Sequence, residues 1–201
     1  CLLMHELTQL NEGLLACVFD SLDRIQHMFL RDRPDFVEDW YVKQDLLLGR
    51  VEGALRSLGQ EGVRIILVSD HGFAPFRYKV NLNRWLVEHG YLVRRERTTA
   101  LRLESVDWSR SRAYALGLNS IYLNVQGREG RGIVPVGEAD SLVLQIAGEL
   151  MAWRGTDGTP VVRRAVRRQD TFTGPLAEYG PDLVVGYSRG YRASSETGLG
   201  N

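Results

Sequence analysis

One apolar stretch of the chain ends abruptly on two side chains that can bind metals. Residues 64–73 read RIILVSDHGF, so Asp70 and His71 directly follow the apolar run. Asp and Gly are common turn residues, and one interpretation of Asp-His-Gly is therefore a plain turn. The other is a metal site, because zinc, manganese and iron all accept carboxylate oxygen and imidazole nitrogen. The stretch alone leaves both interpretations open.

A second acid and imidazole pair follows another apolar run. Residues 13–20 read GLLACVFD, and Asp23 and His27 come soon after them. Residues four apart share one face of a helix, so these two side chains could reach the same ion. A helical Asp and His at this spacing is also common as an ordinary surface pair. Two such pairs, each placed just after an apolar run, make a site for divalent cations an equal alternative to a turn and a surface pair.

The elements around the two pairs predict how they would meet. Residues 13–20 and 63–68 have the length and apolar character of buried strands, and residues 37–62 between them have a helical repeat. A strand, helix, strand order predicts a parallel pair joined by a crossover. Ligands of open α/β sheets bind at the carboxyl ends of the strands. We therefore expect both pairs at one sheet edge.

The rest of the chain continues the alternation of helices and strands, which predicts an α/β fold. Asn81 is a candidate N-cap and Gly90 a candidate stop for a helix within residues 80–93. Further helices are expected over residues 1–11, 21–29 and 136–153, and strands within residues 112–125, 159–172 and 180–187. The turn GREGRG, residues 127–132, is either a surface turn or a backbone cradle for phosphate.

Composition limits the classes of function. The 201 residues carry 25 basic and 25 acidic side chains, so charge does not suggest a nucleic-acid polymer or a membrane surface as partner. No apolar run approaches the roughly 18 residues of a membrane span. The two cysteines, Cys1 and Cys17, exclude a disulfide scaffold and fit a reducing compartment. We therefore expect a cytoplasmic protein.

Four segments together resemble a known group of enzymes. FDSLDRIQHMF at residues 19–29 and ILVSDHGF at residues 66–73 resemble the metal-binding motifs of the alkaline phosphatase superfamily. The similarity is to its type I phosphodiesterase/nucleotide pyrophosphatase branch, which includes a group of predicted phosphohydrolases or phosphomutases. The segments LNSIYLNVQGREGRGIV, residues 118–134, and GPDLVVGYSRGYRAS, residues 180–194, look like the same group.

The resemblance implies a fold, a metal site and a reaction. The fold would be the three-layer alkaline-phosphatase-like α/β fold, with a mostly parallel central sheet. Asp23 and His27 would bind one divalent metal ion and Asp70 and His71 a second, with zinc expected and manganese as the alternative. The reaction would be hydrolysis of a small phosphoester, in which a metal-activated Thr or Ser forms a covalent phospho-enzyme.

The sequence departs from that family in what it lacks. The family's nucleophile and a further metal-binding Asp lie upstream, and another metal-binding His lies downstream, and none has a match here. Residues 1–201 are therefore expected to be a partial catalytic domain, inactive alone, with four of six protein ligands. Two alternatives stay open: a phosphomutase resembling cofactor-independent phosphoglycerate mutase, and a catalytically inactive α/β binding domain.

Residues 74–135 leave the core α/β pattern and return to it, as an inserted cap would. We expect this segment to set substrate specificity. Four polar side chains follow the second metal pair closely and could approach a substrate phosphate, although the residues themselves favour an ordinary solvated loop: Arg77, Tyr78, Lys79 and Asn81.

Overall fold

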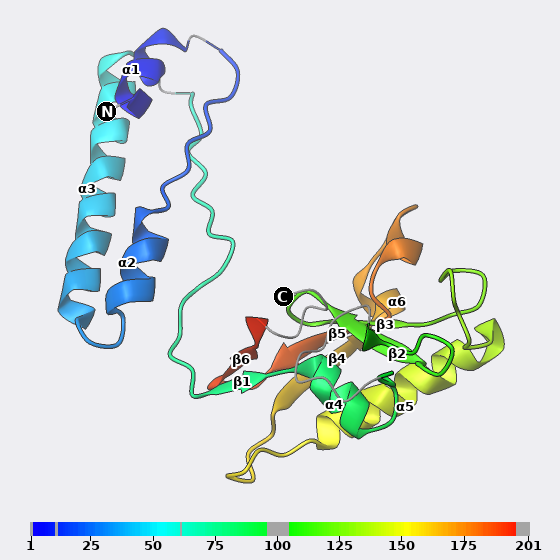
Figure 1. The fold of residues 1–201 in the computed structure, drawn as a ribbon. Helices are drawn as coiled ribbons and strands as arrows, with labels where there is room; N and C mark the ends of the chain where they lie inside the picture. The colour runs from blue at the N-terminus through cyan, green and yellow to red at the C-terminus, as the bar shows by residue number, and fades with distance from the viewer. Residues whose placement is uncertain (1, 11, 61, 96–104, 196–201) are drawn as a thin grey trace. The chain divides into compact units, whose positions relative to one another are not determined.

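The computed structural model describes residues 2–10, 12–60, 62–95 and 105–195. The chain divides into two compact units, Cys1–Pro75 and Phe76–Asn201. Helices and long extended runs make up the first unit, whereas the second combines helices with sheets (Figure 1). The predicted mixture of helices and strands is therefore confirmed.

The first unit contains helices α1 (Leu2–Gln9), α2 (Ser21–Phe29) and α3 (Pro34–Ser57). Helix α3 begins with Pro34, whose fixed φ suits the first helical position. It stops before Gly59, whose φ of +68° is a left-handed conformation that glycine adopts without strain. All three helices occupy segments that the sequence predicts as helical.

Helix α2 is positioned by α3. The rings of Phe29 and Phe36 meet edge to face at 5.0 Å between centroids, across the loop that joins the two helices. Farther along, the Gln44 side-chain amide donates a hydrogen bond to the Ser21 hydroxyl at 3.4 Å. These contacts at both ends of α2 fix the face that carries Asp23 and His27.

The strands predicted at residues 13–20 and 63–68 are not formed in this structure, so that prediction is wrong here. Both segments run without a regular hydrogen-bonded neighbour among the described residues. Their apolar side chains are exposed, with Val18 at 91% and Val68 at 85%. A strand requires a partner for its backbone N–H and C=O groups, and a local apolar pattern cannot reveal whether one is present.

The second unit is built on two sheets. Strands β1 (Tyr78–Val80) and β6 (Tyr191–Ala193) form a parallel pair. A four-stranded antiparallel sheet has the order β2-β3-β5-β4. Its strands are β2 (Ala113–Leu116), β3 (Ser120–Leu123), β4 (Val162–Arg167) and β5 (Leu183–Tyr187). The sheets are thus only partly parallel.

The helices of this unit are α4 (Leu82–Glu88), α5 (Ala139–Ala152) and the one-turn α6 (Arg168–Thr171). Short 3-10 turns lie at Val136–Glu138 (η2) and Ala177–Tyr179 (η3). The predicted cap is confirmed, because the Asn81 side chain accepts a hydrogen bond from the Arg84 backbone N–H at 3.0 Å. The predicted hairpin around Gly117 is confirmed as β2 and β3.

The core of the second unit lies between the four-stranded sheet and helices α4 and α5 (Figure 1). Alternate residues of the strands are fully buried there, including Ala115, Ile121 and Val185. Helix α4 also reaches the edge of the sheet, where the buried Asn83 side chain donates to the Ala115 carbonyl at 2.9 Å and accepts from its N–H at 2.8 Å. This pairing satisfies both outer backbone groups of Ala115 on the edge strand β2.

In the part of the chain that the structure describes, none of the helices combines the length and the apolar character that a membrane crossing requires.

Candidate metal centre

The four metal-ligand candidates of the sequence lie together in the first unit. The pair on helix α2 is in contact, with His27 Nε2 at 3.6 Å from an Asp23 carboxylate oxygen. The other Asp23 oxygen lies 3.8 Å from His71 Nε2, and His71 Nε2 lies 3.6 Å from an Asp70 oxygen. A continuous chain of contacts therefore runs from His27 through Asp23 and His71 to Asp70.

The His71 ring is oriented by the backbone beside it. Its Nδ1 lies 3.1 Å from the Gly72 carbonyl oxygen, and a carbonyl only accepts, so Nδ1 carries the hydrogen and donates it. In the neutral ring the lone pair is then on Nε2, the atom that faces the two carboxylates. Metal-binding histidines are commonly oriented in this way by a carbonyl on the second nitrogen.

Phe73 contacts both imidazoles, and the sequence interpretation assigned it no role. Its ring meets His27 edge to face at 4.7 Å between centroids and His71 at 5.5 Å. Phe73 thus limits the rotation of both rings toward the carboxylates. The sequence could have indicated this contact, because Phe73 belongs to the motif SDHGF and lies two residues after His71.

The site is open to solvent. The side chains of Asp23, His27 and His71 are 43%, 63% and 55% exposed, and that of Asp70 is 89% exposed. Exposed ion pairs contribute only about 0–1 kcal/mol to stability. Folding therefore gains little from bringing these four polar side chains together.

The four side chains are of donor types that divalent cations accept. Ligands about 2.0–2.1 Å from a tetrahedral zinc ion are about 3.4 Å from one another. The three observed nitrogen to oxygen distances, 3.6, 3.8 and 3.6 Å, are close to that edge length. Within the described residues, no group of three or more His, Cys, Asp or Glu side chains could hold a metal ion. Two of the contacts join the pairs that the sequence assigns, Asp23 with His27 and Asp70 with His71, and the third links Asp23 to His71 across them.

The four substrate-site candidates lie in the second unit. The Arg77 backbone N–H donates to the Gly190 carbonyl at 2.7 Å, at the start of the β1 and β6 pair. The Tyr78 ring stacks on Tyr191 at 5.1 Å, and Lys79 is exposed on β1. Asn81 caps helix α4. Their role toward a substrate stays a prediction.

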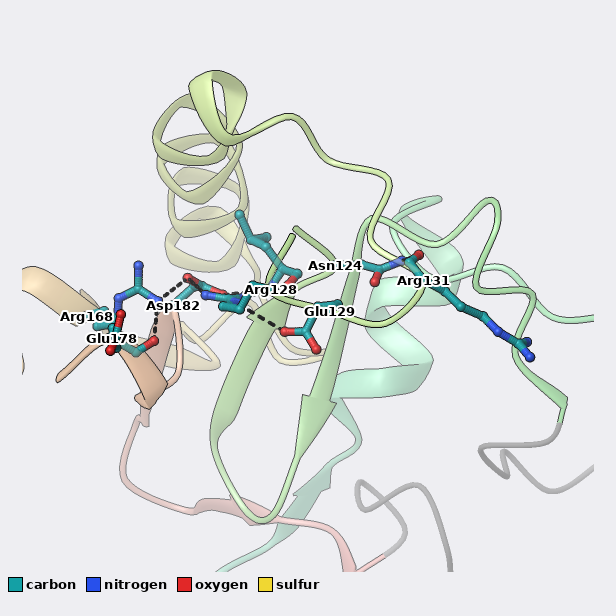
Figure 2. A network of polar contacts seen from close by, with 8 residues as sticks. Asn124, Arg128, Glu129, Arg131, Arg168, Glu178 and Asp182 are labelled. Atoms are coloured by element: carbon teal, nitrogen blue, oxygen red, sulfur yellow. Dashed lines mark hydrogen bonds and ion pairs between the residues drawn. The ribbon is translucent and has the colours of Figure 1, made fainter. Parts of the chain in front are cut away.

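The turn GREGRG serves the fold through Arg128. This side chain donates two hydrogen bonds to the nearly buried Asp182, at 2.9 and 2.6 Å. Asp182 also accepts from the Leu123 backbone N–H at 2.7 Å and pairs with Arg168 at 3.1 Å (Figure 2). Arg128 is thereby neutralised inside the fold, which favours the surface-turn interpretation over a phosphate cradle for this residue.

Comparison with known proteins gives one match. The sequence model of the family described as type I phosphodiesterase / nucleotide pyrophosphatase matches residues 5–200. Neither the curated proteins nor the solved structures yield a match to the chain.

Proposed function

Because the chain belongs to the type I phosphodiesterase/nucleotide pyrophosphatase family, which has an alkaline-phosphatase-like fold and includes phosphodiester-hydrolysing enzymes, we propose that its reaction is a two-metal hydrolysis of a small phosphoester. The substrate would be a phosphodiester or a pyrophosphate. Membership of the family supports a hydrolase. The metal dependence, the covalent phospho-enzyme and the substrate class are the parts that we propose.

The contacts among Asp23, His27, Asp70 and His71 are the observation that carries the metal proposal. We assign Asp23 and His27 to one ion and Asp70 and His71 to the other, with zinc as the expected metal. Bound divalent cations would neutralise charge on the phosphoryl oxygens and lower the pKa of a coordinated hydroxyl group. The remaining ligands and the nucleophile would come from segments outside these 201 residues.

The residues of this chain have separate tasks in the proposed site. The Gly72 carbonyl keeps the proton of His71 on Nδ1, so that Nε2 is available as a ligand. Phe73 packs against both imidazoles and restricts their rotation. Asp23 lies between His27 and His71, so its two oxygens connect the two halves of the site. The segment 74–135 would determine which substrate is bound. The cytoplasmic location is a separate prediction, which comes from the cysteine content.

The test is metal content and activity of the full-length protein that contains this chain. We expect about two equivalents of zinc or manganese per chain, and about one in His71→Gln and in His27→Gln. Hydrolysis of bis(p-nitrophenyl) phosphate should fall at least about a hundredfold in both variants. His5→Gln is the matched control, because His5 is an exposed helical histidine away from the cluster.

Metal content that is the same in wild type, His27→Gln and His71→Gln would overturn the ligand assignment. Metal binding without hydrolysis, together with phosphoryl transfer between two hydroxyls of one substrate, would favour the phosphomutase instead. Absence of both metal and turnover would leave the inactive binding domain.

A further inference from the structure

The second unit contains a cavity that the proposed phosphoesterase site does not use. Its volume is about 690 Å³, and the residues around it come from the β2 and β3 hairpin and from the segments before and after it. Sites for small molecules generally have volumes of roughly 300–1,000 Å³. Among the lining residues are Trp108, Tyr114, Asn124, Glu129 and Arg131. The cavity thus combines aromatic surface with charge.

Aromatic rings form a supported wall of this cavity. The Trp108 and Tyr114 rings meet nearly at right angles, with centroids 5.2 Å apart. Tyr114 also stacks on Tyr122 across the hairpin, at 5.6 Å and 17° between planes. A ring held by two others keeps its orientation, so a flat ligand would meet a surface that is already formed.

The buried Asn124 fixes two lining residues relative to each other. Its side-chain amide donates to the carbonyl of Trp108 and to that of Arg131, both at 3.0 Å, and to the Ser111 carbonyl at 2.9 Å. Asn124 is only 1% exposed, so these hydrogen bonds are shielded from water. The backbone positions of Trp108 and Arg131 are therefore tied together across 23 residues of sequence.

The charges at the cavity favour an anion. Two arginines and one acid line the cavity, and the acid, Glu129, pairs with Arg128 at 3.1 Å. The Arg131 side chain extends away from that network, and no ion pair to it is found among the described residues (Figure 2). Arg95 also lines the cavity, but its positive charge is one of the causes that lower the pKa of the Asp107 carboxyl group. Among the described lining residues, Arg131 is therefore the cation available to an anion.

We propose that this cavity binds a small aromatic anion, with the ring packed on Trp108 and Tyr114 and the acidic group paired with Arg131. A planar ring gains stacking contacts from the wall, and a carboxylate or phosphonate gains a charge-assisted hydrogen bond from the guanidinium. A ring without an acidic group would use only the aromatic wall, and an acidic group without a ring would use only Arg131. The site consists of residues of the second unit only, so ligand binding there can be tested independently of the metal centre.

Calorimetric titration of the chain in EDTA tests the proposal without interference from metal. Phenylphosphonate is the probe, because its carbon–phosphorus bond is not a phosphoester bond. We expect it to bind at least about tenfold more tightly than inorganic phosphate or benzyl alcohol, which carry only one of the two features. Arg131→Gln and Trp108→Ala should each weaken binding by about tenfold or more.

Arg163→Gln provides the matched control, because Arg163 is an exposed arginine on β4 outside the cavity lining. Its affinity for phenylphosphonate should equal that of the wild type. Arg131 is exposed, so its replacement tests the site even if Trp108→Ala fails to fold. Absence of phenylphosphonate binding, or equal affinity in wild type and Arg131→Gln, would overturn the proposal.

Discussion

At the scale of single residues, Asp182 joins several polar groups of the second unit. This carboxylate is 5% exposed and accepts hydrogen bonds from Arg128 and from the Leu123 backbone N–H, while Arg168 pairs with it from another segment. Removing one partner of a buried ion pair leaves charge without compensation, which costs more than the pair itself gains. The network is thus essential to stability although it does no chemistry.

Asp182→Asn should lower the free energy of unfolding by about 2–3 kcal/mol, because Arg128 and Arg168 lose the carboxylate that they share and Arg128 keeps Glu129 alone. Urea unfolding followed by circular dichroism measures the change. Asp170→Asn is the control, since the pair of Asp170 with Arg167 is solvent-exposed and should leave the midpoint unchanged. Equal losses in both variants would contradict the assigned role of Asp182.

Buried tyrosines predict a loss of stability in alkali. Burial raises the pKa of Tyr187 and Tyr114, and burial followed by Glu149 raises the pKa of Tyr91 to about 12. The unfolded chain therefore releases these protons first, at its ordinary pKa of about 10, and unfolding becomes more favourable as pH rises from 10 toward 12. Urea unfolding at successive pH values should show this decline.

Tyr187→Phe should make that decline shallower, because one late-titrating group is removed. Tyr179→Phe, at a side chain that is 70% exposed, should leave its slope unchanged. A decline that is equally steep in all three proteins would show that burial of Tyr187 does not contribute to it.

At the scale of elements, local signals predicted most of the helices and the hairpin. Asn81 and Gly90 were identified as the two ends of one helix, and they flank α4 in the structure. Such caps are readable because the interaction lies within a few residues. Strands β1 and β6 were missed, because each is short and its partner is more than a hundred residues away in sequence.

The cap of α4 can be tested directly. Asn81→Ala should destabilise the second unit by about 1 kcal/mol, since the Arg84 N–H loses its acceptor, whereas Asn81→Asp should retain most of the stability. Thermal unfolding followed by circular dichroism distinguishes the two. If Asn81→Asp lost as much as Asn81→Ala, the side-chain oxygen would not be the stabilising group.

The candidate metal ligands were predicted by type and spacing, and the contacts among them bring all four together. The sequence predicted that two paired strands would bring these side chains together, whereas the structure has two extended segments in place of the strands. Sequence periodicity reports which side chains are apolar, but pairing depends on the partner strand. The link between Arg128 and Asp182 was equally invisible, because it spans 54 residues.

The exposure of residues 63–68 predicts that substitutions there have little effect on stability. Ile66→Lys should change the free energy of unfolding by no more than about 0.5 kcal/mol, because Ile66 is 79% exposed. Val185→Lys, at a fully buried strand position, should cost at least about 3 kcal/mol or prevent folding. Equal losses would mean that residues 63–68 form a buried strand after all.

At the scale of the whole molecule, the two units differ in how much apolar surface they bury. The extensive core cluster belongs to the second unit, whereas the buried hydrophobic residues described in the first are Leu7, Val37 and Leu55. Stability rises with the apolar area removed from water. The second unit should therefore account for most of the cooperative unfolding of this chain.

Limited trypsin digestion tests that difference. Arg64 lies in the extended apolar segment, so cleavage there should precede cleavage within the four-stranded sheet. The C-terminal product should keep the near-ultraviolet circular dichroism of its tryptophans, three of the four in the chain. Early cleavage at Arg163 or Arg164 on β4 would contradict the assignment of stability to the second unit.

The contact of Asn83 with Ala115 has a consequence for how molecules of this protein meet one another. An edge strand with free N–H and C=O groups can recruit a strand from a neighbouring molecule, which is a common beginning of aggregation. On β2, the Asn83 side chain already occupies both outer backbone groups of Ala115. Together with the Tyr91 carbonyl, which accepts from the Ala113 N–H at 3.2 Å, this amide leaves fewer free backbone groups on β2 for a strand of a neighbouring molecule.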